Sequence, residues 1–173
     1  MEALVEFIKI LLPAGIVLYA VFLTVRTLLN REIEMKKLEV RGKTLDTILP
    51  IRLQAYERIT LFLERISPQN LIMRLSDANY TAKDFQKILL DEIRNEFNHN
   101  VSQQVYMSEE VWNLVRNAKE DLIMLINEAS SRMGSESRSI DLSKKIFEIA
   151  LDKSVDPIGH ALSEVKKEIQ QVF

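Results

Sequence analysis

The chain has 173 residues, 47% of them hydrophobic and 28% charged, with four Gly, four Pro and no Cys. Without Cys it has no disulfide, no thiolate metal site and no cysteine nucleophile, and so few Gly and Pro argue against collagen-like, low-complexity and most many-stranded β folds. Its 23 Lys and Arg and 25 Asp and Glu give a formal net charge of -2, so no basic excess favours non-specific binding to nucleic acid.

An uncharged apolar run near the amino terminus predicts a transmembrane helix. Residues Ile10 to Val25 carry no charge, and the run extends back to Phe7 with Lys9 as its only charged residue. A helix of about 20 such residues covers the hydrocarbon core of a bilayer, and Lys9 can reach the headgroups. Two alternatives are a secretory signal peptide and a buried core helix. The acidic start argues against the first, and the absence of a polar face against the second.

The residues that follow this run predict its orientation. Six basic residues lie within 18 positions of its end, namely Arg26, Arg31, Lys36, Lys37, Arg41 and Lys43. Because Lys and Arg concentrate on the cytoplasmic side of a span, we expect the amino terminus outside and the carboxy-terminal part in the cytoplasm. The same six residues are candidate contacts for anionic lipid, although Glu32, Glu34 and Glu39 are interleaved with them.

The sequence predicts three parts: a transmembrane anchor (residues 1–25), a charged juxtamembrane helix (26–43) and a cytoplasmic bundle of about five to six helices (44–173). The charged helix is expected to continue outward from the span, with a narrow apolar stripe at Leu29, Ile33 and Val40. We expect it to end at Gly42, because Gly is the residue most often found just past a helix end.

The first bundle helix is expected from Leu45 to Ile66, with Pro50 near its start. Its apolar residues recur at steps of three and four, which places Tyr56, Ile59, Leu63 and Ile66 on one face. The charged residues beside this face are Arg52, Glu57, Arg58, Glu64 and Arg65. They are either a solvated flank or a buried ion-pair network that holds neighbouring helices in register.

Capping residues mark the later helices. Ser67-Pro68 starts a short helix through about Leu75, and Thr81 starts one that ends near Asn98-His99-Asn100. Ser108 starts the helix that we expect to be most buried, and Gly134 to Ser137 form a loop. Asp141 is expected to cap a helix through about Lys153, and Asp156-Pro157 opens the last one. No stretch alternates with a period of two, so the predicted fold class is all-α.

Two of these helices carry stripes with heptad-like steps. The stripe residues are Val111, Val115, Ala118, Leu122, Leu125 and Ala129 in one helix and Ile158, Leu162, Val165, Ile169 and Val172 in the other. Such steps favour packing inside one bundle; the alternative is self-association through coiled-coil seams, for which runs of two to three heptads are short.

Candidate catalytic and metal-binding residues are few. Glu96 and His99 have the Glu-x-x-His spacing of di-iron carboxylate bundles, and Glu92 lies one turn earlier. The second such motif is missing, because Pro157 precedes His160 at the corresponding position. The alternative is a His near a helix terminus. The chain has no nucleophile elbow, phosphate loop or dinucleotide fingerprint, so we expect no enzyme activity and no cofactor.

Part of the chain resembles a known family. Leu49-Pro50-Ile51-Arg52-Leu53-Gln54-Ala55-Tyr56-Glu57-Arg58 and the stretch from Phe62 to Pro68 are similar to small uncharacterised membrane proteins of Bacteroidota-type bacteria, as is the stretch from Glu96 to Trp112. The resemblance implies one amino-terminal span, a helical cytoplasmic part and the bacterial inner membrane. It implies no activity, cofactor or catalytic residue.

Taken together, these patterns predict a membrane-anchored helical scaffold or accessory subunit that acts through protein–protein interaction, as a homo-oligomer or with another protein. Membrane lipid is expected as a further partner and nucleic acid is not. The alternatives are a module that binds anionic lipid at the membrane surface, and a metal-binding helical enzyme.

Overall fold

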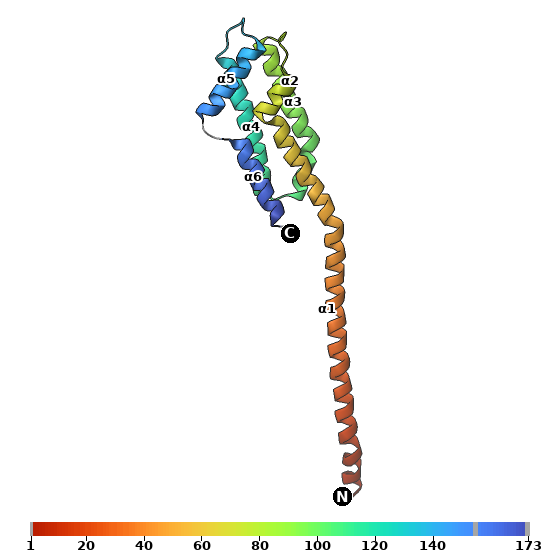
Figure 1. The fold of residues 1–173 in the computed structure, drawn as a ribbon. Helices are drawn as coiled ribbons and strands as arrows, with labels where there is room; N and C mark the ends of the chain where they lie inside the picture. Colours follow the sequence, from red (N-terminus) through yellow and green to blue (C-terminus); the bar gives the residue numbers. More distant parts are fainter. Residues whose placement is uncertain (1, 154–155, 172–173) are drawn as a thin grey trace. The chain divides into compact units, whose positions relative to one another are not determined.

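The computed structural model describes residues 2–153 and 156–171 (Figure 1). Their backbone forms α1 (Glu2–Ile66), α2 (Pro68–Leu75), α3 (Ala82–Asn100), the 3₁₀ helix η1 (Val101–Tyr106), α4 (Glu109–Ser131), α5 (Ser139–Asp152) and α6 (Pro157–Gln170). Among these residues the only β-type pairing is an isolated bridge between Thr81 and Arg138. The prediction of an all-α fold is confirmed.

The chain divides into two compact units, residues 1–49 and 50–173, and α1 contributes to both. This division falls directly before Pro50. The limits predicted from the sequence, at residues 25 and 43, stay predictions.

The helix predicted to end at Gly42 continues. α1 is helical through Gly42 and through Pro50, so the separate helix expected from Leu45 is part of α1. One Gly inside a helix costs only about 1 kcal/mol relative to Ala. Pro50 costs more, since it has no N–H to donate to the carbonyl of Asp46. The long helical stretches on both sides offset these local costs, because propagating a helix needs no new nucleus.

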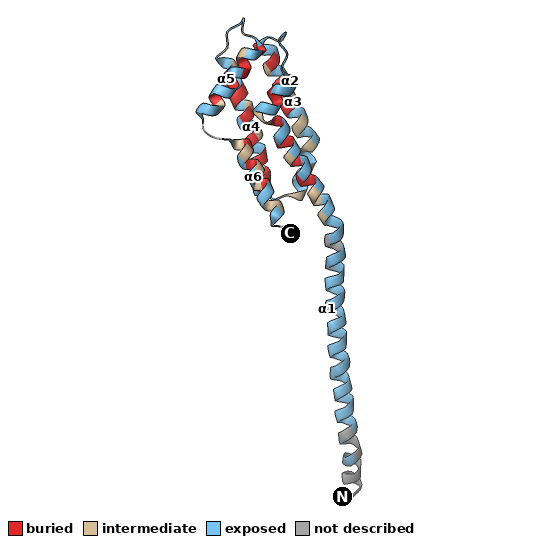
Figure 2. Ribbon diagram, in the orientation of Figure 1, coloured by how far each residue is buried: buried red, intermediate tan, exposed pale blue. Residues whose placement is uncertain are grey.

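The first unit leaves its apolar side chains uncovered. Figure 2 shows the described residues of this part of α1 as exposed, apart from Leu49. The segment Ala14–Val40 is long and apolar enough to span a membrane, with a mean hydropathy of 1.3, and none of it is buried. Neighbouring helices would cover a core helix, so the buried-helix alternative is wrong. The same length and composition also suit a signal sequence.

Three of the predicted capping residues occupy their expected positions in the second unit. The Thr81 hydroxyl accepts from the Asp84 amide at 3.1 Å, and the Ser108 hydroxyl accepts from Val111 at 3.2 Å. The Asp156 carboxylate accepts from the Gly159 amide at 2.8 Å. Each bond satisfies an amide that the first helical turn leaves without a partner. These side chains therefore fix where α3, α4 and α6 begin.

Other helix ends differ from the prediction. Helix α5 starts at Ser139, two residues before the expected cap, and Asp141 instead lies in the first turn and accepts from the Arg138 amide at 3.0 Å. This is the return half of a capping box, in which an acidic residue at the third helical position serves the residue before the helix. Ser67 precedes α2 as predicted, but its hydroxyl donates to the Glu64 carbonyl. The 3₁₀ helix η1 was not predicted.

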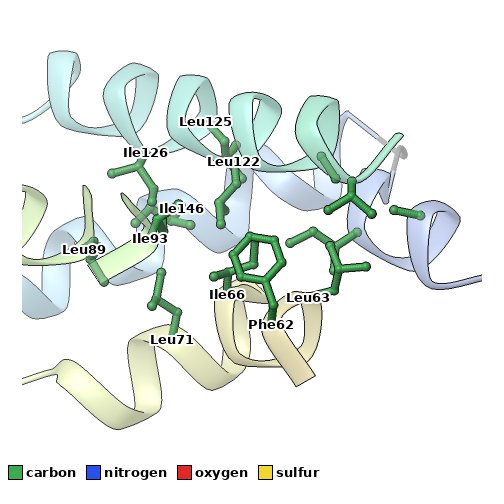
Figure 3. Packing of buried hydrophobic residues seen from close by; sticks show 14 of the residues in the cluster. Phe62, Leu63, Ile66, Leu71, Leu89, Ile93, Leu122, Leu125, Ile126 and Ile146 are labelled. Atoms are coloured by element: carbon green, nitrogen blue, oxygen red, sulfur yellow. The ribbon is translucent and has the colours of Figure 1, made fainter. Parts of the chain in front are cut away.

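The core of the second unit is one apolar cluster. It contains the apolar faces predicted for α1 and α4 and the described part of the one predicted for α6, together with buried residues of α3 and α5. Figure 3 shows Phe62, Leu63 and Ile66 of α1 pointing toward Leu122 and Leu125 of α4. These faces bury side chains with the helical period, which is why the spacing of apolar residues predicted them. The core fixes α4, α5 and α6 beside the carboxyl end of α1, where the candidate site lies.

Candidate docking groove

A groove opens on the second unit where five helices meet. Its volume is about 810 Å³, and it lies between the α1–α2 turn, the middle of α4, the end of α5 and the start of α6. We call it the docking groove; its lining residues are Glu64, Ser67, Pro68, Gln69, Asp121, Leu122, Met124, Leu125, Glu128, Phe147, Ala150, Leu151, Lys153, Asp156, Pro157, Ile158, Gly159 and Leu162. It is large enough for several side chains of another molecule.

Apolar side chains form the floor of the docking groove and remain open to solvent. Leu122 and Ile158 belong to the buried core, whereas Met124, Phe147 and Leu151 are exposed, Leu151 to 79%. Single exposed apolar residues are ordinary on a protein surface, but several grouped in one concavity mark an interaction site. The floor can therefore take up apolar side chains of a ligand or partner.

Carboxylates dominate the rim. Glu64, Asp121, Glu128 and Asp156 line the groove, with Lys153 as its one lining cation among the described residues. Lys153 donates to Glu128 at 2.7 Å, and this hydrogen bond lowers the pKa of Glu128. Asp156 is engaged at the start of α6, while Glu64 and Asp121 form no side-chain ion pair with any described residue. The rim thus carries net negative charge, and two of its carboxylates can accept a cation.

Gly159 leaves room for the Asp156 carboxylate to approach the backbone at the start of α6. A Cβ atom at this position would lie 2.2 Å from the Asp156 carboxylate, which caps the helix. Any larger residue would push that carboxylate aside and weaken the cap. Gly159 therefore keeps the cap, and with it this edge of the groove, in place.

A second group of polar residues joins α1, η1, α4 and α6 outside the docking groove. The Tyr56 hydroxyl donates to Glu168 at 2.7 Å and accepts from Arg52 at 3.1 Å. Arg52 also donates to the Tyr106 carbonyl at 3.1 Å, and the second oxygen of Glu168 accepts from the Ser108 hydroxyl at 2.8 Å. We call this the Tyr56–Glu168 network. Its members are tied to one another, so it is a structural junction.

The Tyr56–Glu168 network predicts a pH dependence at alkaline pH. Burial raises the pKa of Tyr56, the hydrogen bond to Glu168 raises it further, and Arg52 acts in the opposite direction. The folded state therefore favours the neutral phenol, and this stabilisation is complete below the ordinary pKa of about 10. It is lost as pH rises through the folded-state pKa. We expect near-ultraviolet absorbance titration to show one late-ionising tyrosine that Tyr56→Phe removes; an unchanged titration would contradict this.

The candidate metal ligands are engaged with arginines. Glu96 accepts from Arg65 at 2.6 Å, and Glu92 pairs with Arg74 and lies 4.0 Å from Arg65. His99 is exposed near the end of α3. In the part of the chain that the structure describes, no three His, Asp or Glu side chains gather as metal ligands. The two carboxylates instead join α3 to α1 and α2 through ion pairs at the surface, since the Arg65 side chain is 51% exposed, and not through the buried network considered for the flank of α1.

The stripe residues of α4 and α6 lie within the bundle. Val111, Val115, Ala118, Leu122, Leu125, Ala129, Ile158 and Val165 are buried, and Leu162 and Ile169 pack against them. Val172 lies outside the described residues. The structure thus uses these side chains for packing inside one chain, which was the first of the two readings of their spacing. Four of them, Leu122, Leu125, Ile158 and Leu162, also line the docking groove, and self-association through the stripes stays a prediction.

The basic candidates for lipid contact are partly engaged by acids. Lys36 lies 3.5 Å from Glu32 and Lys43 lies 2.7 Å from Glu39, both one helical turn apart. Arg26, Arg31 and Lys37 are exposed, and the side chain of Arg41 lies outside the described residues. Pairs of this kind reduce the positive charge that a lipid surface would meet.

Sequence reasoning missed the docking groove. Its floor residues Phe147 and Leu151 are spaced by four on α5, one position after the inward-facing Ile146 and Ala150. An apolar pair on the outward side of an amphipathic helix was the available signal, because a solvated helix face is normally polar. The spacing of apolar residues within α5 does not indicate which other helices contribute to the groove.

Comparison with known proteins places the chain in an uncharacterised group. A family model described as "Family of unknown function (DUF7935)" matches residues 2–172. No curated protein and no solved structure matches the chain. The match agrees with the expected uncharacterised family and supplies no activity, substrate or partner.

Proposed function

The chain belongs to the DUF7935 family, and from its structure we propose that it is a membrane-anchored helical scaffold or accessory subunit whose bundle binds a segment of a partner protein in the docking groove. The observation that carries this proposal is the groove itself, an apolar floor open to solvent inside an acidic rim. The other polar groups described above, the Tyr56–Glu168 network and the ion pairs of Glu92 and Glu96, hold helices together. Their structural role agrees with a binding function for the docking groove.

The proposed anchor is a single span near the amino terminus, with the amino terminus outside and the helical bundle in the cytoplasm. The uncovered apolar side chains of α1 support a bilayer environment, since water does not favour so many of them on one helix. The basic residues after the span support the orientation. The resemblance to membrane proteins of Bacteroidota-type bacteria supports the bacterial inner membrane as the location.

The chemistry of the docking groove defines the partner segment. Apolar side chains of the partner would cover Met124, Phe147 and Leu151, and Lys or Arg beside them would meet Glu64 and Asp121. Apolar contact at the centre supplies affinity, and complementary charge at the rim supplies orientation and rate. The partner segment is therefore amphipathic and basic.

A defined peptide tests this chemistry. The full chain is placed in nanodiscs of neutral phosphatidylcholine, and binding of a fluorescent helical Leu/Lys peptide is followed by anisotropy. Replacing Glu64→Lys together with Asp121→Lys is expected to weaken binding about tenfold, with a larger loss at low ionic strength. A matched peptide with Glu in place of Lys is expected not to bind.

Two further variants separate docking from bulk charge. Glu136→Lys makes the same change at an exposed loop residue outside the groove and is expected to leave binding unchanged. Leu151→Asp adds negative charge but removes an apolar contact. Docking predicts weaker binding by Leu151→Asp, whereas simple electrostatic attraction predicts tighter binding. Tighter binding, or an equal loss in Glu136→Lys, would overturn the proposal.

A further inference from the structure

A second apolar feature lies in the first unit and has no cover among the described residues. Starting at Leu28, positions along α1 follow one another at alternating steps of three and four. They are Leu28, Arg31, Met35, Leu38, Gly42, Leu45 and Leu49, and all but Arg31 are apolar or Gly. We call these positions the stalk seam. Alternating steps of three and four are the a and d positions of a coiled coil.

The stalk seam is exposed from Leu28 to Gly42, whereas the side chain of Leu45 lies outside the described residues and Leu49 is half-buried. Leu28, Met35 and Leu38 are exposed to 60%, 70% and 64%, and a Cβ at Gly42 would meet nothing within 4 Å. The same steps continue along the sequence through Arg52, Tyr56, Ile59, Leu63 and Ile66. There the last four side chains are buried in the bundle core. One seven-residue pattern is thus used for packing after Pro50, whereas its residues Leu28, Met35 and Leu38 before it are exposed.

Charge placement argues against lipid as the cover: the candidate span Ala14–Val40 overlaps the seam as far as Leu38, but all charged residues of that span lie from Arg26 onward. Between Leu28 and Leu49 the seam residues alternate with charged ones, and the ion pairs Lys36–Glu32 and Lys43–Glu39 lie on the helix surface beside it. Such a density of charge belongs in water and not in a hydrocarbon core. The cover must therefore be protein that presents a matching apolar seam with the same repeat.

A second copy of this chain presents that seam. We propose that residues 28–49 of two copies form a parallel coiled coil through the stalk seam. A shared membrane anchor gives both copies the same direction and concentrates them in one plane. The strict seven-residue repeat lets both seams stay in contact over about 33 Å by winding left-handedly. The proposal goes beyond the docking groove and needs only the anchoring part of the proposed function.

Arg31 occupies a d position inside the seam. A polar residue at a core position of a coiled coil costs stability and helps to fix register and the number of strands. Ile33, by contrast, is exposed and lies at the f position, on the far side of the helix from the seam. These two residues give two tests. Dimerisation through the seam should become stronger when Arg31 is replaced by an apolar residue, and it should not change when residue 33 is replaced by a charged one.

Cysteine cross-linking of the full chain in phospholipid vesicles tests the arrangement directly. The chain has no Cys, so single substitutions from residue 33 to residue 46 give an unambiguous scan. We expect disulfide-linked dimers to peak at residues 35, 38, 42 and 45 and to be minimal at 33, 37 and 40. A flat profile, a peak at 33 and 40, or cross-links only to another protein would overturn the proposal.

Charge variants provide the second measurement. In the Gly42→Cys background, Leu38→Glu is expected to reduce the dimer yield about tenfold, Ile33→Glu to leave it unchanged, and Arg31→Leu to raise it. An equal effect of Leu38→Glu and Ile33→Glu would overturn the seam. Peptide binding by the docking groove is read in the same preparations. Loss of cross-linking with intact peptide binding refutes the seam alone, and the reverse result refutes the groove alone.

Discussion

Replacing Phe62→Ala is expected to lower the free energy of unfolding of the helical bundle by about 3–5 kcal/mol. Phe62 is 1% exposed, and Figure 3 shows it between Ile66 and Leu63 of its own helix and the side chains of α4. Its ring lies 5.9 Å from that of Phe97, which in turn stacks on Trp112 at 5.6 Å. Truncation removes a large apolar side chain and leaves a cavity that three helices cannot close without moving.

The measurement uses the single tryptophan of the chain. Trp112 lies in the same aromatic group, so its fluorescence in detergent micelles reports unfolding of the bundle. Leu61→Ala is the matched control, because Leu61 is the preceding residue of α1 and is 53% exposed. We expect this change to stay within about 0.5 kcal/mol. Equal losses in the two variants would contradict the described orientation of α1.

The same aromatic group shows how far the sequence predicts the fold. The inward faces follow from the spacing of apolar residues within each helix, and the helix starts follow from local caps such as Thr81 and Ser108. Both are short-range properties, since a helix repeats every 3.6 residues and a cap acts within one turn. Phe97 packs against the core from α3, but its contacts with Phe62 and Trp112 depend on how three helices cross.

Long-range features were beyond sequence reasoning for the same reason. Arg65 and Glu96 are 31 residues apart, and their ion pair depends on the packing of α3 against α1. The docking groove is a gap between five helices, so no single segment encodes it. The continuation of α1 through Gly42 and Pro50 was missed because residue preferences at one position are small beside the stability of a long helix.

Glu168→Ala is expected to cause the second largest loss in the free energy of unfolding of the bundle. The residue belongs to the Tyr56–Glu168 network, which depends on contacts between distant parts of the chain. Glu168 accepts three hydrogen bonds, from the Tyr56 hydroxyl at 2.7 Å and from the amide and hydroxyl of Ser108 at 2.8 Å each. Tyr56 precedes it by 112 residues and Ser108 by 60. One carboxylate thus joins the end of α6 to α1 and to the first turn of α4.

Removing that carboxylate leaves buried or helix-terminal donors without an acceptor. Hydrogen bonds to a charged group contribute about 1.5–3 kcal/mol, and part of this is recovered by water at the exposed Ser108, so we expect a loss of about 2 kcal/mol. Glu168→Gln keeps the size and one acceptor and should lie between the alanine variant and the original. Glu164→Ala, one turn earlier, removes only a pair with Lys167 and should cost less than either.

The titration of Tyr56 distinguishes loss of this network from a general loosening of the bundle. The hydrogen bond to Glu168 is one of the causes that raise the pKa of Tyr56, after burial. In Glu168→Ala the pKa of Tyr56 should therefore fall, because burial is then the only effect that opposes Arg52. In Phe62→Ala, which leaves the carboxylate in place, it should not change below the unfolding transition. Suppose that Glu168→Ala destabilises the bundle without lowering this pKa. The carboxylate then does not maintain the contact between α1 and α6. In that case α6 is held by its apolar face at Ile158, Ala161 and Val165 alone.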